Sequence, residues 1–100
     1  MFKTLYPDFI KLWIHYQENG VSVSGLTNLY VDIKYVDGTN ILSGQMLTEE
    51  GSSSVYSYIW DARSVQLGRM VNVTFRQNTI VLEVEEYVFD ITEDQDGIII

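Results

Sequence analysis

Residues 29–46, LYVDIKYVDGTNILSGQM, contain the pattern of a complete β-hairpin. Asp37-Gly38 interrupts two alternating segments and suits a two-residue turn, in which both central residues have positive φ. A one-residue slip would send the apolar side chains to the solvent face, so the register is well specified. The pairs expected on the apolar face are Leu29–Met46, Val31–Gly44, Ile33–Leu42 and Tyr35–Asn40.

A second hairpin is predicted around Gln77-Asn78, between residues 70–76 and a strand from Thr79 onward. Beyond Val84 the apolar phase changes, which indicates a β-bulge near Glu85-Glu86. The expected pairs are Phe75–Ile80, Val73–Leu82, Val71–Val84 and the opposite-charge pair Arg69–Glu86.

Further short strands are expected at residues 9–16, 21–26 and 55–60, with a loop at 48–54 and a connection at 61–68. No stretch has sustained helical periodicity. About seven short strands predict an all-β fold, an antiparallel β-sandwich. One hundred residues suffice for a single domain over 1–100, in which residues 93–100 are a candidate terminal arm.

Charge and composition exclude several classes of function. Six basic residues against fourteen acidic ones give a net charge of −8, which argues against nucleic-acid binding and against adsorption to anionic membranes. There is no cysteine, so disulfides and thiolate metal sites are ruled out. The amino-terminal residues have no long apolar run, so neither a signal peptide nor a membrane span is expected. A protein made in the cytoplasm is the expectation.

No residue set has the pattern of an active site. His15 is the only histidine and alternates with Trp13, as expected of a sheet position. Glu83 and Glu85 share one strand face, as on a solvated surface, and are not separated by a sugar-sized cleft. Asp94 begins a stretch similar to a calcium loop, but too few residues follow it. We therefore expect no enzyme, no catalytic residues, no cofactor and no metal.

Two features are candidates for binding. Tyr56, Tyr58 and Trp60 share a strand face and belong either to the core or to a platform for stacking sugars. Residues 98–100 are three isoleucines that follow the acidic Glu93, Asp94 and Asp96. These isoleucines either pair with this domain's own sheet or form an arm that adds to a neighbouring subunit.

The middle of the chain, about residues 9 to 61, resembles small β-sandwich modules of tailed-bacteriophage virion proteins, of the immunoglobulin-like or prealbumin-like type. The residues that carry the resemblance are Ile10 to Tyr16, Gly25-Leu26-Thr27, Val31-Asp32-Ile33, Asp37-Gly38-Thr39, Met46-Leu47-Thr48-Glu49 with Gly51, and Val55-Tyr56-Ser57-Tyr58.

This resemblance implies a non-enzymatic structural protein of the virion. The specific expectation is a capsid decoration or cement protein that stabilises contacts between major capsid subunits, acting as a homo-oligomer. The alternatives are a tail or baseplate adaptor, or a carbohydrate-binding module that uses the platform described above. The candidate partner-binding residues are Ile98, Ile99, Ile100, Phe2, Leu5 and Tyr6.

Overall fold

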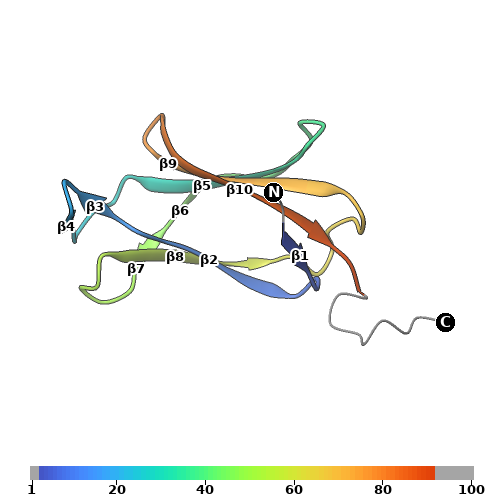
Figure 1. Ribbon diagram of the computed structural model, residues 1–100, viewed down its shortest axis with the longest axis horizontal. Helices are drawn as coiled ribbons and strands as arrows, with labels where there is room; N and C mark the ends of the chain where they lie inside the picture. Colours follow the sequence, from blue (N-terminus) through green and yellow to red (C-terminus); the bar gives the residue numbers. More distant parts are fainter. Residues whose placement is uncertain (1–2, 92–100) are drawn as a thin grey trace.

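The computed structural model describes residues 3–91, which form two facing sheets and no helix (Figure 1). The larger sheet has the order β1 (Lys3–Leu5), β10 (Ile80–Phe89), β9 (Met70–Gln77), β5 (Leu29–Tyr35) and β6 (Asn40–Met46). The smaller sheet has the order β2 (Phe9–His15), β8 (Val55–Asp61) and β7 (Thr48–Glu49). A separate hairpin pairs β3 (Gln17–Glu18) with β4 (Val21–Ser22). The predicted all-β sandwich is confirmed.

The core lies between the two sheets and follows the period of two that the sequence predicts. In the larger sheet, Val31 pairs with Phe75 and Ile33 with Val73, and all four side chains are buried. Trp60 of the smaller sheet meets Phe89 of the larger one edge to face, with ring centroids 5.4 Å apart. Each such side chain contributes about 1.5–3 kcal/mol through burial.

The turn of the first hairpin is one residue longer than predicted. The Gly38 amide donates to the Tyr35 carbonyl, and the Tyr35 amide donates to the Thr39 carbonyl. Gly38 has a φ of 94°, so the loop is a three-residue turn that ends in a glycine bulge. Because the longer turn offsets the register, Lys34 faces Asn40, whereas the predicted pair of Ile33 with Leu42 is confirmed.

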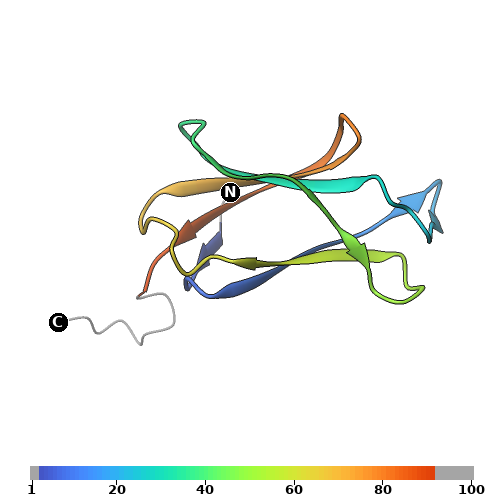
Figure 2. The same cartoon turned by 180° about the vertical axis from the view of Figure 1, so that it is seen from behind.

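A second bulge moves the far end of the same hairpin in the opposite direction. Gly44 has a φ of 65°, and its amide donates to Oδ1 of Asp32 at 2.7 Å. Tyr30, not Leu29, therefore faces Met46. Met46 is exposed, and Leu47 is buried where the chain passes from β6 in one sheet to β7 in the other (Figure 2).

The register predicted for the second hairpin is wrong. Ile80 faces Gln77, so Asn78 and Thr79 form the turn, and Phe75 faces Glu83. The bulge lies between Val81 and Glu83, not near Glu85-Glu86. The tip of this hairpin bends away from the smaller sheet (Figure 1). Because the bulge shifts the register, Val84 faces Thr74, on the side of the sheet opposite to Phe75 and the core. Three side chains predicted in the core are exposed: Ile80, Leu82 and Val84.

The predicted ion pair between Arg69 and Glu86 is also wrong, because Glu86 faces Asn72 and Arg69 pairs with Asp37. Residues 3–91 contain ten strands and not about seven, since four pieces of two or three residues are too short to show periodicity. One of them, β1, is parallel to β10. Residues 93–100, the candidate arm, lie outside the described residues.

Candidate contact surface

The outer face of the smaller sheet carries three large exposed apolar side chains. They are Phe9 and Trp13 of β2 and Ile59 of β8, with 54%, 55% and 54% of their surface exposed. Ile59 faces Lys11, midway between the two aromatic residues, so it is a diagonal neighbour of both. We call these three residues the aromatic patch. Large exposed apolar side chains gathered on one face, here around Lys11, are typical of a contact surface.

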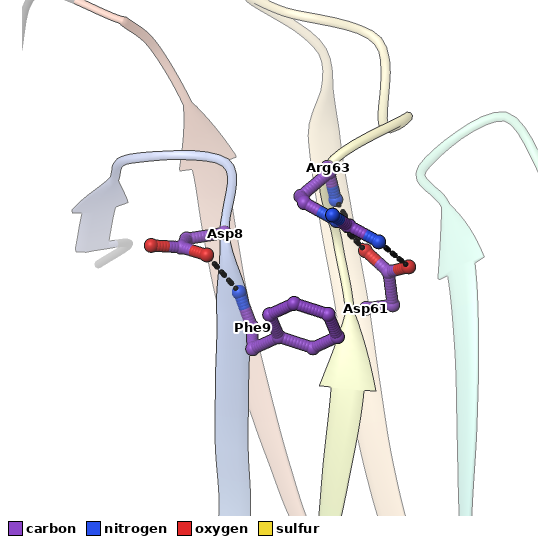
Figure 3. A network of polar contacts seen from close by, with 4 residues as sticks. All are labelled: Asp8, Phe9, Asp61 and Arg63. Carbon is purple, nitrogen blue, oxygen red and sulfur yellow. Dashed lines mark hydrogen bonds and ion pairs between the residues drawn. The ribbon is translucent and has the colours of Figure 1, made fainter.

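One end of the patch is bordered by an ion pair (Figure 3). The Arg63 guanidinium lies 4.5 Å from the centroid of the Phe9 ring and donates two hydrogen bonds of 2.9 Å to the Asp61 carboxylate. These bonds lower the pKa of Asp61 to about 2 and raise that of Arg63. The Phe9 amide donates to the Asp8 carboxylate at 2.8 Å. Because both partners of the Arg63–Asp61 pair stay charged at any physiological pH, the Arg63 guanidinium is held above the Phe9 ring.

Lys11 borders the middle of the patch. Its Nζ atom lies 2.7 Å from the Glu50 carboxylate, and this contact lowers the pKa of Glu50. Exposed pairs of this kind add little to stability. Their effect is to frame an apolar centre with oriented charges, which is the usual arrangement of a protein interface.

His15, at the end of β2, contacts two serines. Its Nε2 atom lies 2.9 Å from Oγ of Ser22 and 3.1 Å from Oγ of Ser54, and Ser54 is buried. Nearby, the Glu49 carboxylate accepts hydrogen bonds from the Ser24 hydroxyl and from the Ser54 amide. The bond from Ser24 is the main reason that the pKa of Glu49 is lowered. These polar residues tie β2 and β7 to the neighbouring loops.

The proposed sugar platform of Tyr56, Tyr58 and Trp60 is wrong. Tyr56 and Trp60 are buried, and Tyr58 packs against the core. The Tyr56 hydroxyl is engaged in hydrogen bonds with two backbone groups of a loop. Bulky side chains on an inward strand face belong to the core here, so their rings are not available for stacking.

The sequence-predicted contact residues are dispersed. Leu5 faces Phe89 at the edge of the core, and Tyr6 is exposed beyond the end of β1. The remaining four lie outside the described residues: Phe2, Ile98, Ile99 and Ile100. The aromatic patch was missed, although β2 carries apolar residues on both faces. That double pattern is the signal that could have revealed it.

An open slot of about 360 Å³ runs along one side of the sandwich, between β2 and the second half of β10. No group of three or more histidine or acidic side chains in residues 3–91 is arranged to hold a metal ion. The same residues include no helix that could cross a membrane. No protein-family model, curated protein or solved structure matches the chain.

Proposed function

We propose that this chain is a non-enzymatic structural protein of a bacteriophage particle, made in the host cytoplasm and built into the virion. Its role would be that of a capsid decoration protein that reinforces contacts between major capsid subunits. The observation that supports a contact role is the aromatic patch, because Phe9, Trp13 and Ile59 expose large apolar areas on a rigid sheet. The assignment to a phage particle rests on the sequence resemblance.

The mechanism would be burial of the patch against a coat subunit. Full burial of a large apolar side chain yields about 1.5–3 kcal/mol, and these three are already about half buried. Binding of one copy would thus gain a few kcal/mol of burial free energy, and the contributions of many copies on a shell would add together. A net charge of −8 separates neighbouring copies and favours a coat surface that is neutral or basic.

Quantitative mass spectrometry of purified particles tests this proposal. A cement protein should approach the abundance of the coat protein, and absence from particles would overturn the assignment. Trp13→Ala should lower the occupancy of particles stripped of the protein and then refilled. Val36→Ala is the matched control, because Val36 is equally exposed but lies on the turn of the larger sheet. Equal occupancy of the two variants would refute a role for the patch.

The candidate arm stays part of the proposal, with Ile98, Ile99 and Ile100 as its apolar end. A chain that ends at Gly97 should bind particles with lower occupancy if the arm adds to a neighbouring subunit. Unchanged occupancy would remove the arm from the mechanism and leave the patch as the contact.

Two alternatives are distinguished by the same material. A tail or baseplate adaptor would be present in only a few copies per particle. A carbohydrate-binding module is favoured by one observation, the exposed Trp13 ring on the outer face of the smaller sheet. If sugars, and not particles, shielded Trp13 from acrylamide, the carbohydrate-binding function would replace the proposed one.

A further inference from the structure

The edge of β10 is only partly covered. β1 pairs with its last residues, Tyr87 to Phe89 (Figure 1). Within the described part of the chain, residues 80–85 have a strand neighbour on one side only, which is β9. Sheet edges are usually protected by charged residues, lysine above all, by proline, by β-bulges or by a covering segment, and this edge has a bulge between Val81 and Glu83 and the inward-pointing Glu83 and Glu85. Residues 80–85 contain neither lysine nor proline, and Ile80, Val81 and Val84 are more than half exposed.

The slot runs directly beneath this edge. Glu83 faces Phe75 and Glu85 faces Val73 across the β9–β10 ladder, so both glutamates point to the same side of the sheet as these core residues. They line the slot together with Ile10, Leu12 and Ile14 of β2; two lysines also line it, Lys3 and Lys11, and Lys11 is paired with Glu50. A strand added to β10 would therefore place alternate side chains between carboxylates and an apolar wall.

The two carboxylates differ in what they already bind. Glu85 accepts a hydrogen bond from the Tyr87 hydroxyl, and burial together with this contact raises the pKa of Tyr87. The Glu83 side chain makes no hydrogen bond or ion pair with any of residues 3–91. Glu83 is thus the group that a ligand in the slot would meet unpaired.

Charge also excludes one simple occupant. If two copies paired their β10 edges about Val84, Glu83 of one copy would face Glu85 of the other, and like charges directly opposite are destabilising. The chain's own tail is disfavoured for the same reason, because Glu93, Asp94 and Asp96 would bring further negative charge to Glu83 and Glu85. The side chains that suit this slot are lysine and arginine, because their aliphatic stems pack on the apolar wall while the charged end reaches Glu83.

We infer that the edge of β10 above this slot binds an extended segment of a partner protein in which basic and apolar residues alternate. The segment would pair its backbone with the uncovered part of β10, in the manner of β-strand addition. Its basic residues would face Glu83 and Glu85, and its apolar residues would lie beside Val84 on the opposite face. The inference does not rest on the phage assignment, because the edge and its carboxylates carry it, although Trp13 of the aromatic patch also lines the slot.

A capped synthetic peptide of alternating lysine and valine is the probe, titrated into the ¹⁵N-labelled full chain. We expect the largest amide shifts and slowed hydrogen exchange at residues 81–85. Glu83→Gln should weaken binding by roughly fivefold, as expected for loss of one partly exposed ion pair. Glu18→Gln, at an exposed position on β3, is the control with the same charge change and should bind like the unmodified protein.

A second peptide with the same side chains, N-methylated on every residue, separates strand addition from attraction by net charge. It should not bind, because it cannot donate to the β10 carbonyl groups. Equal binding of the two peptides, equal weakening by the two variants, or tighter binding of an acidic peptide spanning residues 92–100 would each overturn the inference.

Discussion

Loss of a single hydroxyl group, in Tyr56→Phe, should destabilise the protein measurably even though the ring stays in place. Tyr56 is completely buried, and its hydroxyl donates to the Val23 carbonyl at 2.8 Å and accepts from the Leu26 amide at 3.2 Å. The variant leaves both backbone groups without this partner. Such a loss costs about 1–3 kcal/mol. The hydroxyl thereby ties the loop that precedes β5 to the smaller sheet.

Urea unfolding followed by far-ultraviolet circular dichroism measures this cost. With a slope of about 1–1.5 kcal/mol per M urea for a chain of this size, the midpoint should fall by about 0.7–3 M. Tyr58→Phe is the control on the same strand, because the Tyr58 hydroxyl has no hydrogen bond to any described residue. Its effect should stay within about 0.5 kcal/mol. Equal midpoints for the two variants would refute the role of the Tyr56 hydroxyl.

Three further predictions concern charge, register and exposure. Arg76 donates from Nε to the Asp32 carboxylate at 2.6 Å, and this contact lowers the pKa of Asp32 from 3.8. The pair therefore stabilises the fold above that pH and loses its effect as the pH falls through the lowered pKa. Asp32→Asn should cost about 1–3 kcal/mol at neutral pH, with a difference from the unmodified protein that shrinks below about pH 4 in urea titrations. Leu47→Ala should lower the free energy of unfolding by about 2–5 kcal/mol, because Leu47 is buried, and Met46→Ala should lower it much less, because Met46 is exposed. The reverse order would support the register predicted from sequence, in which Met46 faces inward. In Trp13→Phe the remaining Trp60 should show blue-shifted emission and resist acrylamide, whereas strong quenching would place it at the surface.

The sequence predicts the centre of the fold because alternation and burial agree there. β5 and β9 each place one set of apolar residues inward, and Val31, Ile33 and Val73 are completely buried as their spacing requires. The Asp37-Gly38 turn is correctly located, but its length depends on a glycine bulge that period-two reasoning does not detect.

The second hairpin shows where the same reasoning fails. Ile80, Leu82 and Val84 alternate like core residues, yet all three are exposed. The bulge between Val81 and Glu83 shifts the register, so Glu83 and not Val84 lies on the inward side, opposite Phe75. Alternation shows which residues share a face of an unbroken strand, but it does not reveal where a bulge exchanges the two faces. The parallel contact of β1 with β10 joins the two ends of the described chain, and no local pattern encodes it.

The aromatic patch escaped prediction for a related reason. β2 is apolar on both faces, so its period does not say which face is exposed until the partner layer is known. Once the core takes Leu12 and Ile14, Phe9 and Trp13 must face outward.

The shielding of Trp13 on the particle tests the contact role most directly. In a Trp60→Phe chain, Trp13 is the only tryptophan, so acrylamide quenching reports on the patch alone. The account predicts strong quenching in the unbound protein and protection when it is bound to phage particles. Bound protein whose Trp13 is quenched as readily as in solution would contradict it.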